Sequence, residues 1–374
     1  EFAESTGLLR AEVPPKRYLW TDAFAVCNFL ELYRQTGDEA WRESALHLVD
    51  QVHHILGRHR KDDPRSGWIS GLGEEAGSRH PTAGGLRIGK PLGERNPADP
   101  PDDLLEWDRD GQYYHYVTKW MHALNRVSRI TDNPTFNAWA IELAKSAHAA
   151  FVYRSQAGAK RMYWKMSIDL SRPLVRSMGQ HDPLDGLITY KQLQQAASGF
   201  SKRAQPGLDS EIADLEALCS GVNWTTEDPL GIGGLLTDAY RIAQMIVNNG
   251  FTGNGLLADV LEAALAGLEA YMDGQAYRLP AGYRLAFREL GLSIGLHAVE
   301  KAKGLAEGRS DIFSEDHRIR AQIKELGHYI HLSESIEAFW LEPENRKPRS
   351  WTEHKDINSV MLATSLAPDT YLGC

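Results

Sequence analysis

Helical stretches that are apolar almost all round alternate with one-sided helical stretches along these 374 residues, and this alternation constrains the fold most. Residues 23–30 are nearly all apolar, which predicts a helix over residues 22–36 that is buried on most sides. Gly37 and Asp38 end this helix and cap a second one, whose apolar residues from Trp41 to Leu56 lie on one face. The pattern predicts an inner layer of helices covered by an outer one.

The same pairing recurs down the chain. Residues 112–130 and 134–151 form the clearest second pair. Further pairs are expected at residues 185–200 with 208–219, 230–247 with 255–272, and 285–303 with 319–341, followed by a lone helix at 356–366. Gly291 and Gly295 predict a close approach of two helices. The repetition shows no break, so we expect one all-α domain over residues 1–374.

Two regions depart from the helical pattern. Residues 161–167 alternate and predict a short hairpin arm. Residues 60–101 are rich in Gly, Pro and charge, and we expect them to be an ordered loop insert packed over one face.

Composition excludes several classes of protein. The formal net charge of -9 disfavours nucleic-acid binding, which needs a basic face. No apolar run approaches the roughly 20 residues that span a bilayer, and no signal peptide is visible. Three cysteines, an odd and sparse set, fit a reducing, cytoplasmic location. The histidines lack zinc-enzyme spacing and residues 231–234 match no nucleotide-binding loop, so neither a metal nor a cofactor is expected. The oligomeric state stays open.

Residues 18–22 and 32–38, which begin and end the first predicted helix, carry a family resemblance together with the alternation of helices. Their layout resembles the helical hairpins of the six-hairpin glycosidase superfamily, the (α/α)6 toroids, and of the related sugar epimerases. The resemblance implies an (α/α)6 toroid and a substrate funnel where the inner helices begin. Helix N-termini there offer unpaired N–H groups and partial positive charge.

Residues 104–115 form the strongest candidate site. Asp108 and Asp110 stand among Trp107, Tyr114 and His115. Glycoside hydrolysis needs two carboxyl groups, and sugars also need an aromatic surface for their C–H faces. We expect Asp108 to act as the general acid, with Asp110 as its substitute. The structural alternative is an acidic helix cap.

The second carboxyl group is expected near the last helix. Glu353 is the candidate general base, His354 is its substitute, and Trp351 is expected to line the substrate subsites. Capping by Asp356 is the structural alternative.

Other candidates precede apolar helices at separate places in the chain. The substrate-binding set is completed by Trp20, Asp22, His181, Asp185 and Arg288. Each also has a structural interpretation: Asp22 and Asp182 as helix caps, Trp20 as a core residue, and Arg288 in a core salt bridge.

Three functions remain open. The first is a glycoside hydrolase or other glycan-processing enzyme, with a carbohydrate as its partner molecule. The second is a sugar epimerase or isomerase that moves a proton with paired histidines, for which His115, His181 and His354 are available. The third is a binding toroid without catalysis.

Overall fold

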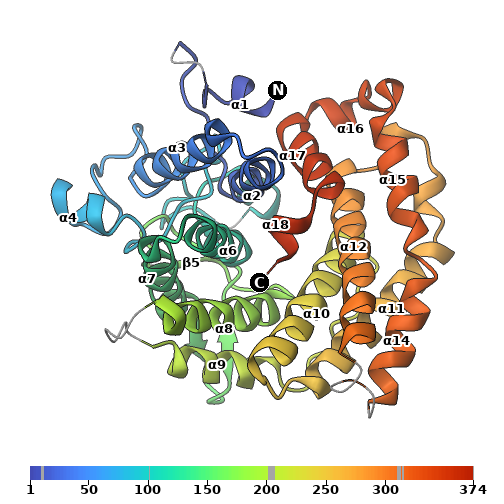
Figure 1. Ribbon diagram of the computed structural model, residues 1–374. Coiled ribbons are helices and arrows are strands. Elements are labelled where there is room, and N and C mark those ends of the chain that lie inside the picture. The colour runs from blue at the N-terminus through green and yellow to red at the C-terminus, as the bar shows by residue number, and fades with distance from the viewer. Residues whose placement is uncertain (10–11, 101, 201–206, 310–312, 314–315, 374) are drawn as a thin grey trace. The chain divides into compact units, whose positions relative to one another are not determined.

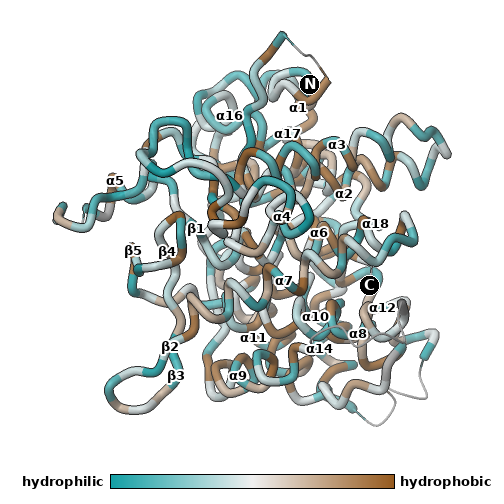
Figure 2. Tube along the Cα trace, turned by 90° about the vertical axis from the view of Figure 1, so that its left-hand side faces the viewer, coloured by the Kyte–Doolittle hydropathy of each residue, from teal (hydrophilic) through white to brown (hydrophobic). Residues whose placement is uncertain are grey.

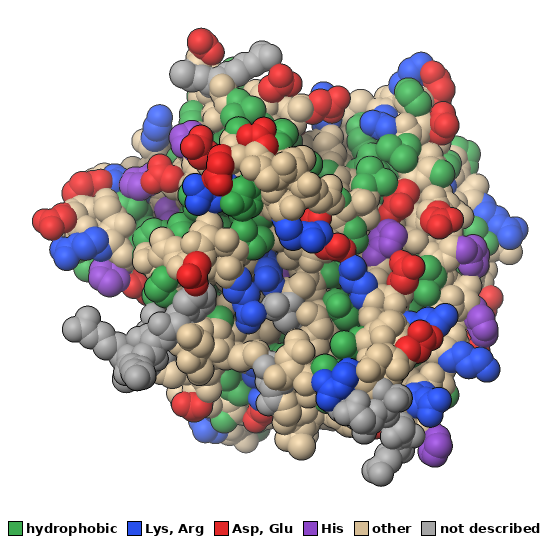
Figure 3. All heavy atoms as spheres, viewed as in Figure 1, with side chains coloured by type: hydrophobic (Ala, Val, Ile, Leu, Met, Phe, Trp, Pro, Cys, Tyr) green, Lys and Arg blue, Asp and Glu red, His purple; other side chains and the backbone are tan. Residues whose placement is uncertain are grey.

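The computed structural model describes residues 1–9, 12–100, 102–200, 207–309, 313 and 316–373. The chain forms two compact units, residues 1–220 and 221–374. They are described separately below, and the expected single domain stays a prediction. Figure 3 shows charged side chains of both signs interspersed over one face, in keeping with the modest net charge.

The first unit contains three helical hairpins. Its long helices are α2 (Leu19–Thr36), α3 (Glu39–Leu56), α6 (Tyr114–Thr131), α7 (Pro134–Phe151), α8 (Asp182–Phe200) and α9 (Asp209–Cys219). Helix α2 packs on α3, α6 on α7 and α8 on α9, while α6 also packs on both α2 and α8. These helices run from blue to green in Figure 1. Each of the three hairpins therefore contributes one inner helix: α2, α6 and α8 in chain order.

The first hairpin shows why its two helices differ. Helix α2 buries every residue from Leu19 to Leu30 except Asn28, as its apolar sequence predicts. It ends at Gly37, whose φ of 69° is the left-handed geometry that favours glycine. Asp38 then accepts a hydrogen bond from the Ala40 N–H and begins α3. Helix α3 buries one side only, and its hydropathy alternates in Figure 2.

Short strands and turns connect the helices of the first unit. The short elements are α1 (Phe2–Ser5), α4 (Glu74–Arg79), α5 (Asp103–Glu106), β1 (Gln112–Tyr113), β2 (Val152–Arg154), β3 (Lys160–Met162), β4 (Lys165–Met166) and β5 (Pro173–Val175). Antiparallel pairing joins β1 to β4, β4 to β5 and β2 to β3. The alternation at residues 161–167 thus belongs to two separate strands.

The long loop insert is held by two groups of ion pairs, one buried around Asp110 and one half-buried around Arg65. Asp110 Oδ2 accepts hydrogen bonds from Arg87 at 2.9 Å and Arg60 at 3.3 Å. Arg65 binds three carboxylates from Asp63, Glu94 and Asp169 at 2.7–2.8 Å. These charges connect residues 60–100 to later parts of the unit, which confirms the predicted insert over its described residues.

The second unit repeats the hairpin plan. Its helices are α10 (Pro229–Asn249), α11 (Asn254–Asp273), α12 (Ala286–Gly308), α14 (His317–Gly327), α15 (His331–Leu341), α16 (Arg349–Thr352), α17 (Lys355–Leu366) and α18 (Asp369–Leu372), with 3-10 turns η1 (Ala276–Arg278), η2 (Ala281–Tyr283) and η3 (Pro343–Arg346). Helix α12 packs on α10, α14, α15 and α17. A continuous helix over residues 319–341 was expected, but α14 ends at Gly327 and α15 starts at His331, because the chain turns between them.

Glycines bring α10 and α12 together. A Cβ on Gly233 would lie 2.0 Å from the Gly291 carbonyl oxygen, and one on Gly295 would lie 2.6 Å from the Gly233 Cα. No side chain fits at these distances, so the predicted close approach at Gly291 and Gly295 is confirmed. Among the residues described, no helix is long and apolar enough to cross a membrane.

Candidate functional site

The N-termini of α2, α6 and α8 meet at one place in the first unit, called here the first rim. The Tyr18 hydroxyl, just before α2, lies 2.5 Å from the Tyr116 hydroxyl in the first turn of α6. His115 Nδ1, also in that turn, lies 3.8 Å from Asp182 Oδ1 at the start of α8. The three helix starts therefore surround a common region, as the predicted funnel requires for this unit.

Aromatic rings line the first rim. The aromatic cluster consists of Tyr18, Trp20, Trp107, Tyr113, Tyr116 and Trp164. Pairing of β1 with β4 places Trp164 beside Tyr113, with ring centroids 5.2 Å apart. Trp107 is 51% exposed and contacts Trp164 edge-on at 5.1 Å. The cluster thus runs from an open tryptophan to buried rings, which suits a ligand with apolar faces.

His115 and Asp182 are polar groups without partners at the centre of this cluster. His115 Nδ1 and Asp182 Oδ2 are both buried and have no hydrogen-bond partner among the described residues. The 3.8 Å between His115 Nδ1 and Asp182 Oδ1 is too long for a hydrogen bond. Buried polar atoms normally find partners, so an orphaned facing pair indicates a place for a ligand or water. The His115 side chain is 30% exposed, so the ring still reaches solvent.

A nearby carboxylate on α8 shows the opposite situation. Asp185 accepts hydrogen bonds from Lys119 Nζ at 2.8 Å and from the Thr118 hydroxyl. Its charge is therefore balanced by Lys119. Asp182, one helical turn earlier, has no such cation within salt-bridge range apart from His115.

These surroundings shift both pKa values. Burial lowers the pKa of His115 to about 4, against the opposing influence of Asp185. Burial, with help from Asp185, raises the pKa of Asp182 to about 7. At neutral pH the imidazole is therefore uncharged and able to accept a proton, while Asp182 is close to half protonated.

Several predicted residues of the first unit fill structural positions. Asp110 is fully buried between Arg60 and Arg87. Asp22 is 1% exposed, accepts a hydrogen bond from the Tyr18 N–H at 2.9 Å and lies 3.6 Å from Arg17. These contacts account for both carboxylates without a substrate.

The remaining candidates of this unit differ in exposure. Trp20 is 6% exposed and lies at the inner side of the aromatic cluster. Tyr114 is fully buried against Phe151, so it offers no open ring face. Asp108 is exposed, and His181 is half-buried just before α8.

The N-termini of α10, α12 and α17 form a second rim in the second unit. Arg288 in α12 donates to Asp228, the N-cap of α10. The Phe287 N–H donates to Asn358 Oδ1 in α17 at 3.0 Å. His354 is exposed, with its ring centroid 5.6 Å from that of Phe287.

The candidates of the second rim are mostly paired. Arg288 is half-exposed and bound to Asp228. Glu353 is exposed and accepts from Arg349 Nε at 2.8 Å. Trp351 is 4% exposed and stacks on Trp340 at 5.7 Å. Asp108 belongs to the first unit and Glu353 to the second, and the pairing of these two residues stays a prediction.

A buried ion pair stabilises the start of α12 at the second rim. Arg284 binds Glu289 through two hydrogen bonds of 2.8 and 2.7 Å, and Trp340 Nε1 donates to Glu289 at 2.8 Å. A core salt bridge was considered for Arg288 from the sequence, whereas the buried pair of this helix start is Arg284–Glu289 and Arg288 binds the half-exposed Asp228.

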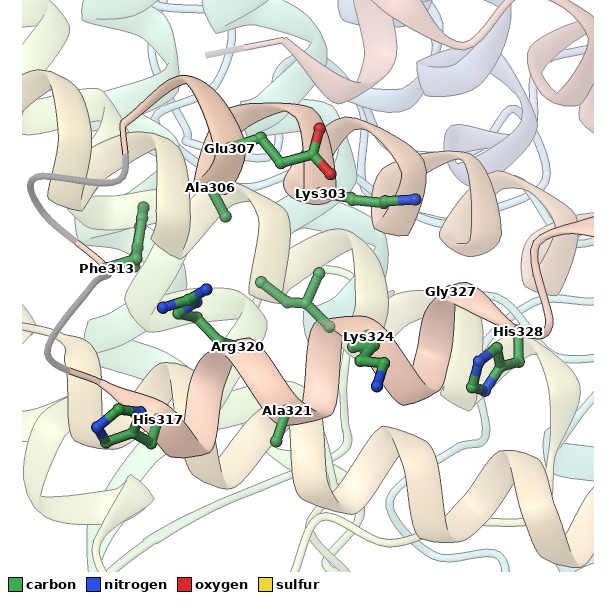
Figure 4. Close-up of a pocket in the computed structure, with 11 residues that line it drawn as sticks. Lys303, Ala306, Glu307, Phe313, His317, Arg320, Ala321, Lys324, Gly327 and His328 are labelled. Atoms are coloured by element: carbon green, nitrogen blue, oxygen red, sulfur yellow. The ribbon is translucent and has the colours of Figure 1, made fainter.

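A groove of about 710 Å³ lies along the other end of α12. Figure 4 shows Lys303 and Glu307 of α12 on one side and Arg320 and Lys324 of α14 on the other. The groove therefore lies at the C-terminal part of α12, whereas the candidate catalytic residues lie at helix N-termini. In the part of the chain that is described, no group of three or more His, Cys, Asp or Glu residues is arranged to hold a metal ion.

Sequence reasoning missed six of the residues described above at the first rim. They are Tyr18, Tyr113, Tyr116, Lys119, Trp164 and Asp182. Asp182 was interpreted as a helix cap. The presence of a second carboxylate, Asp185, three residues later was the signal that one of the two could have another role. Trp164 gave no signal, because only strand pairing brings it to α6.

Comparison with known proteins bears on the fold alone. No family model and no curated protein matches the sequence. A sugar epimerase from a ruminal bacterium matches in structure with a TM-score of 0.51 and 9% identity, over 94% of this chain and 87% of that one. A cellobiose 2-epimerase from Spirochaeta thermophila DSM 6192 matches with a TM-score of 0.50 and 12% identity, over the same shares. The chain has the all-α fold of the (α/α)6 toroids.

Proposed function

We propose that this chain is a carbohydrate-processing enzyme that moves a proton on a sugar, as an isomerase or epimerase, with His115 as the base. The observation that carries the proposal is the orphaned pair His115–Asp182, whose imidazole packs against the rings of Tyr113, Tyr116 and Trp164. An uncharged imidazole beside a carboxyl group is the arrangement that general acid–base catalysis uses.

The reaction follows from the groups present. His115 takes the proton from the carbon next to the sugar carbonyl, and the electron pair of that C–H bond forms a C=C bond. The carbonyl π electrons move to oxygen, which accepts a hydrogen bond and then a proton from the Tyr18–Tyr116 pair. One phenol proton joins the two hydroxyls, so the other is available to the substrate. His115 then returns the proton to the former carbonyl carbon. The hydroxyl on the carbon that lost its hydrogen gives its proton to the phenolate, and this carbon becomes the carbonyl of the isomer.

Asp182 stabilises the charged imidazole. When His115 gains a proton, an ionised Asp182 at 3.8 Å can close on Nδ1 and form an ion pair. Hydrogen bonds of this kind are often long in the free enzyme and tighten with substrate bound. Because burial raises the pKa of Asp182 to about 7, activity should rise as pH increases through 7.

Epimerisation makes one further demand. Inversion at carbon requires the proton to return on the opposite face, and a single imidazole serves one face. A second base, for which His181 of the same unit remains a candidate, would make the enzyme an epimerase. The structural relatives bear the names of sugar epimerases, which supports this version.

The other two hypotheses have less support. Neither of the structural relatives described above is named as a hydrolase, and the expected acids Asp108 and Glu353 are exposed. A binding toroid without catalysis does not require an orphaned acid–base pair, but it would share the aromatic cluster.

Solvent exchange tests the proposal directly. The protein is incubated in D2O with a panel of aldoses, ketoses and disaccharides, and deuterium at the carbon next to the carbonyl is measured by mass spectrometry and NMR. We expect exchange in at least one sugar, with loss of exchange in His115→Asn. His47→Asn is the matched control, since His47 is an exposed histidine of the same unit.

The outcomes separate the three functions. Exchange that gives a new sugar identifies an isomerase or epimerase, and NMR of the product distinguishes these. Release of a free sugar from a glycoside without exchange would establish a hydrolase. Binding without exchange or hydrolysis would leave the toroid as a binding protein, and the proposal would be wrong.

A further inference from the structure

Lys90 brings a positive charge to the first rim without a carboxylate partner. Its Nζ lies 5.4 Å from the centre of the Tyr18 ring. No acidic side chain in the described part of the chain lies within 4.0 Å of this nitrogen, and its residue is half-buried. The other rim lysines are matched, Lys119 by Asp185 and Lys165 by Glu106.

The loop that carries Lys90 is built rigidly. Arg60 Nη1 donates to the Lys90 carbonyl oxygen at 2.6 Å, and the Gly89 N–H donates to Asp110 Oδ1 at 2.9 Å. Gly89 has a φ of +92°, and a Cβ there would lie 2.2 Å from the Arg17 carbonyl oxygen. The buried carboxylate of Asp110 therefore helps to hold Lys90 at the rim, which gives this predicted site residue a positioning role.

Lys90 connects to the proposed base through neighbouring rings. Tyr18, beside Lys90, has its ring centroid 5.5 Å from that of Tyr116, and Tyr116 lies 4.9 Å from the His115 ring. These contacts link Lys90 to the proposed base along one row of rings, so a ligand that lies over the rings can meet His115 with its reacting carbon and Lys90 with a substituent. A partly buried cation without a counter-ion is costly unless a ring or an anion compensates for it.

We propose that Lys90 binds an anionic group of the substrate, so that the sugar carries a carboxylate or a phosphate. This inference rests on the proposed function only for the location of the sugar. The Lys90 ammonium ion forms a charge-assisted hydrogen bond to the anion, and the Tyr18 ring face supports the adjacent C–H groups. Neutral sugars lack this contact and bind more weakly.

Calorimetric binding of three probes tests the inference without requiring turnover. Glucose, glucuronate and glucose 6-phosphate are titrated into the wild type, Lys90→Met and Lys90→Arg. We expect at least one anionic probe to bind more tightly than glucose, and Lys90→Met to weaken that probe by about ten- to a hundred-fold. Glucose binding should change less than two-fold. Comparison of the two anions shows whether the partner is a carboxylate or a phosphate.

Matched variants separate charge from folding. Lys90→Arg keeps the charge and should retain most of the preference for the anion, while Lys61→Met removes an exposed lysine from the same loop and should change nothing. Melting temperatures measured alongside show whether Lys90→Met is folded.

Three results would overturn the inference: equal affinity of the wild type for all three probes, an equal effect of Lys90→Met on all three, or no binding of either anion. Failure of the proposed function has a different signature, because anion binding that depends on Lys90 can persist when no sugar exchanges deuterium. Deuterium exchange of an anionic sugar that is insensitive to Lys90→Met would instead leave the proposed function intact and contradict the anion site.

Discussion

The two rims are built alike and differ in how their polar groups are satisfied. Each gathers the N-termini of three inner helices, α2, α6 and α8 in one unit and α10, α12 and α17 in the other. At the second rim, Arg288 pairs with Asp228 through Nη1, while its buried Nε has no partner among the described residues, and Asn358 accepts from the Phe287 N–H. At the first rim, His115 and Asp182 face each other unbonded.

This difference indicates that one rim serves function and the other serves stability. Satisfied polar groups between helices stabilise the arrangement of those helices. Orphaned buried groups lower stability and persist where a ligand uses them. We therefore interpret the first rim as the catalytic one and the paired groups of the second rim as structural.

The largest expected effect is on activity at the first rim. Replacing His115 by Asn removes the proposed base and should lower sugar exchange by about 10²- to 10⁴-fold, with little change in melting temperature. Deuterium exchange and thermal unfolding measure both. His354→Asn is the matched change at the second rim, and a loss there with none at His115 would reverse the comparison.

The next effect is on stability beside the second rim. Arg284→Met leaves Glu289 buried without its cation, and such a loss costs about 3–5 kcal/mol of unfolding free energy. Denaturant unfolding measures it. Replacing both residues, Arg284 by Met and Glu289 by Leu, should recover much of this loss, and no recovery would show that the pair itself is stabilising.

A smaller change in unfolding free energy, stabilising instead of destabilising, is expected for Asp182→Asn. Its pKa is about 7 when folded against 3.8 ordinarily, so the folded state holds a proton that the unfolded state loses between about pH 4 and 7. Wild-type stability therefore falls as pH rises through this window. Asp182→Asn avoids this loss and should be more stable than the wild type at pH 8 by about 2 kcal/mol, with no gain near pH 4.

Thermal melts at both pH values check this prediction. The same variant should lose the rise of activity near pH 7. Asp185→Asn is the control, because its carboxylate is bound to Lys119 and its replacement should destabilise the protein instead. A destabilised Asp182→Asn at pH 8 would show that this carboxylate is satisfied after all.

The smallest effect is expected for the exposed acids. Glu353→Gln breaks a surface ion pair with Arg349 and should change stability by less than about 1 kcal/mol. Asp108→Asn should leave sugar exchange unchanged, since Asp108 is exposed and His115 is the proposed base. Assays of both variants on glycosides test the alternative directly, because loss of hydrolysis in either would restore the acid pair.

Much of the architecture could be read from local pattern. The alternation of all-round and one-sided apolar helices predicted the hairpins, since burial on one or all sides depends on the spacing of apolar residues along a single helix. Gly37 and Asp38 marked a helix end and a cap for the same local reason. The close approach of α10 and α12 followed from Gly291 and Gly295.

The site was only partly predictable. His115 was named as a candidate, but Asp182 was interpreted as a cap and Trp164 was absent from the list. Asp110 stood in the strongest acidic segment, yet Arg60 and Arg87 come from the loop insert to neutralise it. Pairings across dozens of residues leave no local trace in one sequence.

Sequence by itself determined where most of the long helices lie, which faces they bury and which segments are rich in aromatic and acidic residues. Tertiary structure alone decided which of those charges are matched. The reason is physical: hydrophobic periodicity acts within one helix, whereas the ionisation of His115 and Asp182 depends on burial and on charges from other helices.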